Sequence, residues 1–169
     1  LDYVEVSPEM TLLLGEGPLR EAPVPPDAIA LVYADEATPT LTLDLAPDLS
    51  NIACGGPRLV LLIERRAFVR IGGVLPDDAS CEHGFHLPSA LRAIVLAIRG
   101  ARLQGETQMV YRLGKSIELL CETIRLLGED ELVPVGGDGV LSLDDSRRIV
   151  AARRMIDESG RDIMLEVDG

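Results

Sequence analysis

The sequence predicts an α+β fold, a small β-barrel followed by a helical segment, because its hydrophobic pattern changes near residue 85. Before that point, short apolar runs rich in Val, Ile, Leu and Thr are broken by Gly, Pro and Asp, which is typical of strands joined by turns. After it, apolar residues recur every three or four positions, as on one face of a helix. We therefore expect residues 1–85 to form a barrel or sandwich and residues 86–160 to be helical.

Five apolar runs are candidate strands. One of them, Thr40–Leu45, alternates between polar and apolar residues with a period of two, as a half-buried strand does. The stretch Gly15–Asp27 contains four prolines and is expected to be a loop. The candidate strands are Met10–Leu14, Ala28–Ala34, Thr40–Leu45, Leu59–Ile63 and Ala67–Ile71.

Three helices are expected in the second segment. Pro88 suits the first turn of the first helix, which ends at Gly100. The second helix ends at Gly128, and a capping-box-like sequence at Ser142 begins a third that runs to about Ser159. The first helix carries its apolar side chains on one stripe, which is formed by Leu87, Leu91, Ile94 and Ile98.

The second helix has an apolar seam with the three-four spacing of a coiled coil. Packing of both helices on the barrel would explain such a seam, and so would a two-fold dimer that also uses them. Because Leu119, Cys121 and Leu126 make the helix apolar beside the seam as well, it needs more than one partner, and we expect a homodimer. The seam comprises Val110, Leu113, Ile117, Leu120, Ile124 and Leu127.

The net charge of −12 opposes DNA binding by this chain, since DNA affinity depends on neutralising phosphates. Residues 65–102 are the exception, with six arginines and three acidic residues. Arg65, Arg66 and Arg70 are the densest part of this basic segment. They predict either an anion site or a surface that pairs with the acidic remainder.

The arginines would share a face if Ala67–Ile71 is a strand. Arg66, Phe68 and Arg70 would then point to solvent, with two guanidinium groups about 13 Å apart and an aromatic ring between them. Arginine pairs with phosphate, binds the guanine edge and stacks on bases. Two phosphates with stacked guanines would span this distance, and Arg65 would add a third contact.

Spaced positions in the helical segment form a longer pattern that covers about half of the chain. They are Leu87-Pro88, Leu91-Arg92-Ala93-Ile94, Leu103, Gly105, Tyr111, Gly114-Lys115, Glu118-Leu119-Leu120, Leu143-Asp144-Asp145, Arg148, Ala151 and Arg153. This pattern resembles the region that connects the two halves of AraC-type transcription regulators. The resemblance implies a cupin-like β-barrel sensor, a homodimer, and DNA binding by a domain that begins at about residues 161–169 and is otherwise absent from this chain.

The Arg-x-x-x-Arg pattern of Arg66 and Arg70 resembles that of the CuxR-type sensors within the same family. Those sensors bind cyclic di-GMP through arginines arranged as in the PilZ domain, so the resemblance implies cyclic di-GMP as the ligand. Asp48, Ser50 and Asn51 loosely resemble the second PilZ element, but its glycine comes two residues late and the element precedes the arginines. An Asx-type turn between strands is the alternative for these three residues.

A short cluster of metal-capable residues precedes the first helix. Cys81, His83 and His86 would give three ligands, but no second cluster completes a tetrahedral site. We expect an ordinary loop there and no metal or other cofactor. The odd number of cysteines fits a reducing cytosol, and no apolar run is long enough to cross a membrane, so we expect a cytoplasmic protein.

Two other functions remain open on the sequence alone. One is an AraC-type sensor that holds another small metabolite inside the barrel. The other is a cupin-type metal enzyme, which would need histidines on the strands. We expect no enzyme, because no catalytic triad and no glycine-rich phosphate loop is recognisable.

Overall fold

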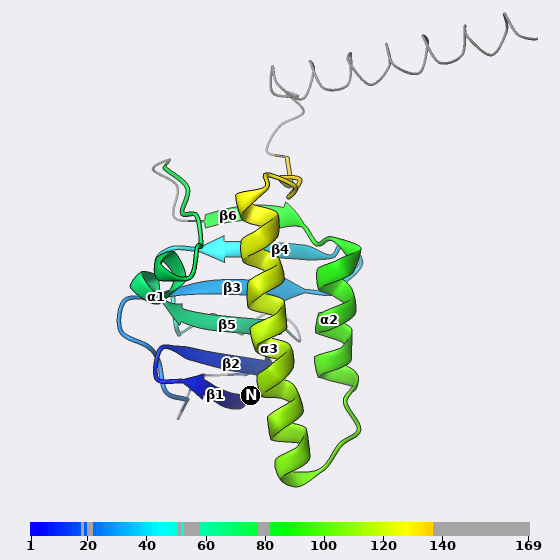
Figure 1. Cartoon of the computed structure of the whole chain (residues 1–169). Helices are drawn as coiled ribbons and strands as arrows, with labels where there is room; N and C mark the ends of the chain where they lie inside the picture. Colours follow the sequence, from blue (N-terminus) through cyan, green and yellow to red (C-terminus); the bar gives the residue numbers. More distant parts are fainter. Residues whose placement is uncertain (18, 20–21, 51, 53–57, 78–81, 137–169) are drawn as a thin grey trace, which may run out of the picture. The chain divides into compact units, whose positions relative to one another are not determined.

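The chain folds into an antiparallel sheet of six strands with two long helices on one face (Figure 1). This computed structural model describes residues 1–17, 19, 22–50, 52, 58–77 and 82–136. The strand order is β1-β2-β5-β3-β4-β6. The elements are β1 (Asp2–Ser7), β2 (Met10–Gly15), β3 (Ala28–Ala34), β4 (Thr40–Asp44), β5 (Arg58–Glu64), α1 (Arg65–Arg70), β6 (Glu82–His86), α2 (Ser89–Gly100) and α3 (Gly105–Gly128).

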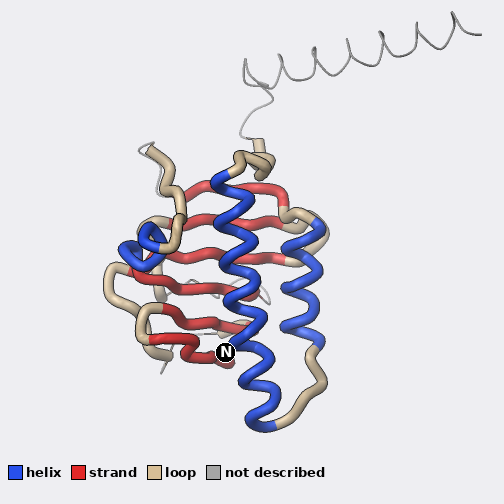
Figure 2. Tube along the Cα trace, viewed as in Figure 1, coloured by secondary structure: helices blue, strands red, loops and turns tan. Residues whose placement is uncertain are grey.

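The α+β class is confirmed, but the sheet is open and the predicted barrel is wrong. Among the described residues, β1 pairs with β2 and β6 pairs with β4 at opposite edges, and the two edge strands do not pair with each other. Both α2 and α3 lie over the same face of the sheet (Figure 2). Because these helices bury the apolar face, the strands need not close on themselves to do so.

Four of the five candidate strands are confirmed as β2, β3, β4 and β5. The fifth prediction, a strand over Ala67–Ile71, is wrong, because Arg65–Arg70 form the helix α1. Two strands were not predicted. The β1 strand mixes acidic residues with its two valines, and β6 contains only one large apolar residue, so neither presents an apolar run.

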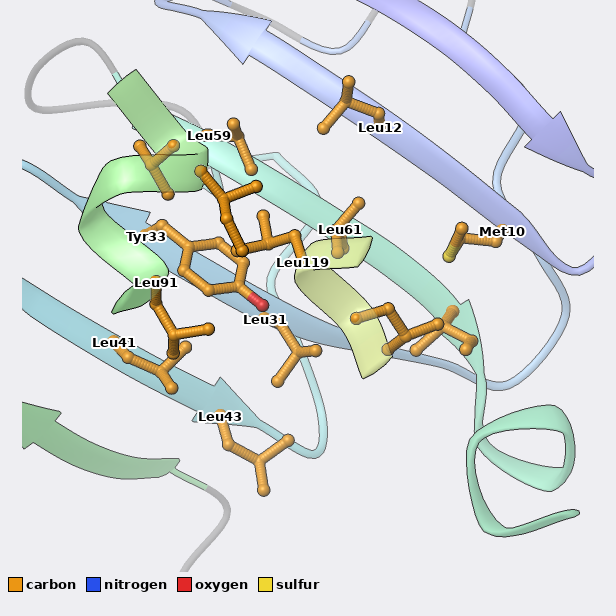
Figure 3. Packing of buried hydrophobic residues seen from close by; sticks show 14 of the residues in the cluster. Met10, Leu12, Leu31, Tyr33, Leu41, Leu43, Leu59, Leu61, Leu91 and Leu119 are labelled. Atoms are coloured by element: carbon orange, nitrogen blue, oxygen red, sulfur yellow. The ribbon is translucent and has the colours of Figure 1, made fainter. Parts of the chain in front are cut away.

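Strand register aligns the core side chains in rows beneath the helices. One row crosses five strands, because Leu12 pairs with Val4 and Leu61, and Leu31 pairs with Leu61 and Leu43. Figure 3 shows Leu12, Leu61, Leu31 and Leu43 on their strands, with Leu91 of α2 and Leu119 of α3 in the same cluster. The next row comprises Leu14, Leu59, Tyr33 and Leu41. The two long helices add Leu91, Val95, Ile98, Leu119, Leu120 and Leu126 to the same core.

The central strand β5 is buried on both faces. Leu59, Leu61 and Ile63 pack under the helices, whereas Val60 and Leu62 belong to a second apolar cluster on the opposite face. Loop residues cover that second cluster, including Leu19, Ala22, Leu49 and Ile52. A strand apolar on both sides therefore stands at the middle of the sheet, where both of its faces are shielded from water.

One buried polar contact links the sheet to α3. The Tyr33 hydroxyl lies 2.8 Å from Thr123 Oγ1, which itself donates a hydrogen bond to the carbonyl of Leu119. The Tyr33 hydroxyl therefore donates to Thr123. Burial raises the pKa of Tyr33, and the phenol stays neutral.

The first two predicted helices are confirmed as α2 and α3, and they share one unit, Leu1–Val135, with the sheet. The predicted third helix, from Ser142 to Ser159, lies outside the described residues. Within the described part of the chain, no helix combines the length and the apolar character that crossing a bilayer requires.

Replacing Tyr33 with Phe should lower the free energy of unfolding by about 1 kcal/mol, because one buried hydrogen bond is lost while the ring keeps its packing. The change is measured by urea denaturation. Tyr3 is the matched control, since its side chain lies on the exposed face of β1. Tyr3→Phe should change stability by less than about 0.5 kcal/mol. Equal stability of Tyr33→Phe and the parent chain would contradict a stabilising role for the Tyr33–Thr123 contact.

Candidate functional site

Helix α1 begins where the sheet ladder ends. The amide of Glu64 donates to the carbonyl of Glu9 at 2.9 Å, and the amide of Arg65 donates to the carbonyl of Asp27 at 3.1 Å. Glu9 and Asp27 immediately precede β2 and β3, the two neighbours of β5. The chain therefore leaves the sheet into α1 beside the turns that lead into both flanking strands.

Helix α1 places Arg66, Val69 and Arg70 on one exposed face, called here the arginine face. Ala67 and Phe68 are buried, whereas these three residues, at positions i, i+3 and i+4, are exposed. Arg66 and Arg70 stand one helical turn apart, about 6 Å along the axis, instead of the 13 Å that a strand would give.

Phe68 lies in the core, so the prediction that its ring faces solvent between the arginines is wrong. Adjacent buried residues, Ala67 and Phe68, cannot both face the core from a flat strand, but they can from a helical turn. The turn after α1 closes over the ring, because a Cβ atom on Gly73 would lie only 2.3 Å from Phe68 Cε1. Phe68 anchors the helix and leaves the arginines outside.

The three arginines of α1 differ in their partners. Arg70 makes two hydrogen bonds to the carboxylate of Glu9, with Nη1–Oε1 at 3.1 Å and Nη2–Oε2 at 2.6 Å. Arg65 donates to the carbonyl of Leu45, and its Nε lies 3.3 Å from Asp27 Oδ2. Arg66 has no hydrogen bond or ion pair to any residue that the structure describes. The arginine face thus offers one guanidinium without a partner in the described part of the chain and one that shares its charge with Glu9.

The Glu9–Arg70 pair shifts both titrations. Hydrogen bonding to Arg70 holds the pKa of Glu9 below its usual range, and hydrogen bonding to Glu9 raises the pKa of Arg70. Both groups are therefore charged at neutral pH. Sequence reasoning missed Glu9, which is 61 positions from Arg70, because nothing local marks it as a partner.

Asp48 and Ser50 form the Asx-type turn that was the alternative for this segment. Asp48 Oδ1 accepts hydrogen bonds from the Ser50 amide at 3.0 Å and from the Ser50 hydroxyl at 2.6 Å. The hydrogen bond from Arg65 to the carbonyl of Leu45 places the start of this loop beside α1. Asn51 lies outside the described residues.

The two histidines of β6 point to opposite faces of the sheet. His83 pairs with Leu43, whose side chain is in the helix-covered core, whereas His86 pairs with Thr40 on the other face. Side chains three residues apart on a strand cannot ligate one ion. Cys81 lies outside the described residues, and no group of three metal-capable side chains occurs among those described.

The predicted seam of α3 divides along its length. Leu120 is buried, and Ile124 and Leu127 pack against the core, whereas Val110 is 68% exposed and Ile117 is 45% exposed. Leu113 lies between them and is half-buried. The buried residues of α3, which face the core, are Ser116, Leu119, Leu120, Thr123 and Leu126.

A separate groove of about 620 Å³ lies between α2 and α3. Ion pairs along its α3 side join Lys115 to Glu118 at 2.6 Å and Arg125 to Glu122 at 2.8 Å. At 100° per residue, these charged positions lie on a different side of α3 from Val110 and Ile117. Cys121 also lines the groove and lies one turn after Ile117, so the exposed apolar stripe of Val110, Leu113 and Ile117, called here the α3 stripe, borders the groove.

The turn after α1 approaches α3 at the end of the same seam. A Cβ atom on Gly72 would lie 3.9 Å from Ile124 Cγ2, so the backbone of this turn packs beside Ile124. Gly72 has φ of +97°, a conformation that favours glycine. Helix α1 is thus in contact with the β1–β2 turn at Glu9 and, through Gly72, with α3.

A comparison of the chain with protein families, with curated proteins and with solved structures finds no match.

Replacing Phe68 with Ala should lower the free energy of unfolding by about 3–5 kcal/mol, because the ring fills a core position. Val69 is the matched control on the same helix, and Val69→Ala should change stability by less than about 0.5 kcal/mol. Denaturant unfolding measures both. If Phe68→Ala proves as mild as Val69→Ala, α1 does not bury Phe68.

Proposed function

We propose that this chain is the ligand-sensing and self-associating part of an AraC-type transcription regulator, and that its arginine face binds cyclic di-GMP. The family proposal rests on the spaced residues of the helical segment described above. The ligand proposal rests on one observation, the exposure of Arg66, Val69 and Arg70 on one face with Arg66 unpaired among the described residues. DNA binding would belong to a part outside this sequence, since the net charge of −12 opposes it here.

The arginine face has the chemistry that a guanine dinucleotide requires. A guanidinium group pairs with phosphate through two parallel hydrogen bonds, and the same group fits the O6 and N7 atoms of guanine. With one helical turn between them, Arg66 and Arg70 fit one phosphate together, or one phosphate and the edge of the adjoining guanine. Val69, 51% exposed between them, supplies an apolar surface on which a base can rest.

Self-association is supported by the α3 stripe. Val110 and Ile117 are exposed apolar residues on a helix whose other side is already buried against the sheet. A two-fold pairing of two copies along this stripe would remove both from water. Leu113, half-buried in one copy, would be covered by the same contact.

The ligand site and the stripe are joined by a short route through the fold. The arginine face belongs to α1, the turn at Gly72 ends α1, and that turn packs beside Ile124 of α3. Ile124 lies about two helical turns beyond Ile117, so a ligand that shifts α1 would act on α3 near the end of the stripe. Regulation follows if cyclic di-GMP prefers one arrangement of the dimer to another.

A metabolite held inside the protein is the alternative ligand. It would need a cavity within a closed barrel, but the strands form an open sheet whose helix-covered face is filled by aliphatic side chains. The arginine face on the surface therefore supports a nucleotide better than an enclosed neutral metabolite.

Replacing Arg66 or Arg70 with Ala should weaken cyclic di-GMP binding at least about tenfold, because each change removes a charge-assisted contact. Stability should change by less than about 0.5 kcal/mol, since both side chains are exposed. Isothermal titration calorimetry measures the affinity, with GMP and ATP as control ligands. Arg102, which is exposed in the loop that connects α2 to α3, is the matched control. The variant Arg102→Ala should bind cyclic di-GMP as the parent chain does. Unchanged binding by both α1 variants would place the site elsewhere.

Replacing Val110 or Ile117 with Asp should convert a dimer to monomer without loss of fold, because both side chains are exposed within one copy. Leu120→Asp should instead unfold the chain, because it buries a charge in the core. Sedimentation velocity and thermal melting separate the two effects. If the parent chain sediments as a monomer at high concentration, with and without ligand, the proposed dimer contact along the α3 stripe is contradicted.

A further inference from the structure

The Glu9 carboxylate binds the Arg70 guanidinium in the way that a phosphate would. Its two carboxylate oxygens each accept one hydrogen bond from the guanidinium, at 3.1 and 2.6 Å. Parallel bonds of this kind are also how arginine holds phosphate, so a phosphate and the Glu9 carboxylate compete for the same donors. Both side chains are solvent-accessible, Arg70 at 62% and Glu9 at 39%, so an incoming anion can reach the pair.

The backbone holds Glu9 in this position independently of Arg70. Its carbonyl accepts the amide of Glu64 at 2.9 Å, and its own amide donates to the Ser7 hydroxyl at 3.2 Å. Glu9 therefore stands at the end of β5 whether or not its carboxylate is paired. This backbone anchor keeps the Glu9 carboxylate close to the arginine face, within reach of Arg70.

The two arginines of the face consequently differ in availability. Arg66 is unpaired among the described residues, but Arg70 becomes available only when Glu9 is displaced. An anion that contacts one guanidinium gains little by displacing a carboxylate of similar strength. A ligand that also contacts Arg66 and Val69 gains enough from these contacts to displace Glu9.

We propose that Glu9 is a specificity-determining residue that acts as an internal competitor for Arg70 and so favours extended phosphate ligands over small anions. This inference rests on the proposed binding of an anionic ligand at the arginine face. An exposed ion pair contributes modestly, so Glu9 tunes affinity by a few-fold and does not block the site.

The test is Glu9→Gln, which removes the charge and keeps both backbone hydrogen bonds. Glu5→Gln is the matched control, because Glu5 is an exposed carboxylate on β1, and it corrects for the general effect of one negative charge. Calorimetry with cyclic di-GMP at fixed ionic strength should show about fivefold tighter binding for Glu9→Gln and less than about twofold for Glu5→Gln. In an Arg70→Ala background, Glu9→Gln should no longer add affinity.

The outcomes separate this inference from the proposed ligand. If cyclic di-GMP binds Glu9→Gln as tightly as the parent chain, or more weakly, Glu9 is not a competitor for Arg70. The proposal that cyclic di-GMP is the ligand is then unaffected. Absence of cyclic di-GMP binding in every variant overturns the ligand. In that case the role of Glu9 is tested by titration with inorganic pyrophosphate, and its binding is followed by NMR through the arginine Nε–H signals. A stronger response of Arg70 in Glu9→Gln than in the parent chain sustains this role, and an equal or absent response overturns it.

Discussion

Burial of β5 on both faces is the constraint from which the rest of the structure follows. A strand with Leu59, Leu61 and Ile63 on one side and Val60 and Leu62 on the other loses stability wherever either side meets water. The central place in the sheet, with helices over one face and loops over the other, satisfies both sides. The same placement explains why the sheet stays open, because the helices do the covering that a barrel would otherwise do.

The end of β5 also determines the character of the candidate site. Glu64 and Arg65 give their amides to the two flanking turns, and the chain then turns into α1. Phe68 fills a core position, so the remaining face of this short helix must point to solvent. The charges of Arg66 and Arg70 are thus presented outward by an apolar anchor, at the spacing of one helical turn.

Helix α3 serves the core and the surface at once. Ser116 and Thr123 are polar yet buried, and each directs its hydroxyl to a carbonyl four residues earlier, which satisfies it within the helix. Thr123 in addition receives the Tyr33 hydroxyl, which sets one position of α3 on the sheet. The exposed part of α3 includes two residues of the α3 stripe, Val110 and Ile117. The helix therefore has an apolar surface left for another partner.

Local patterns in the sequence were sufficient for α2, α3 and the four strands β2 to β5, because apolar periodicity reports burial wherever an element packs on one face or lies wholly inside. The chemistry of the arginines could also be predicted from the sequence, since charge and side-chain type do not depend on fold. The geometry of the arginines could not be predicted in this way. The segment from Ala67 to Ile71 alternates well enough for a strand, and only the core that receives Phe68 makes it a helix. Likewise, Glu9 meets Arg70 only because β2 and β5 are neighbours in the sheet. A contact between residues so far apart in the chain depends on strand order, which tertiary packing decides.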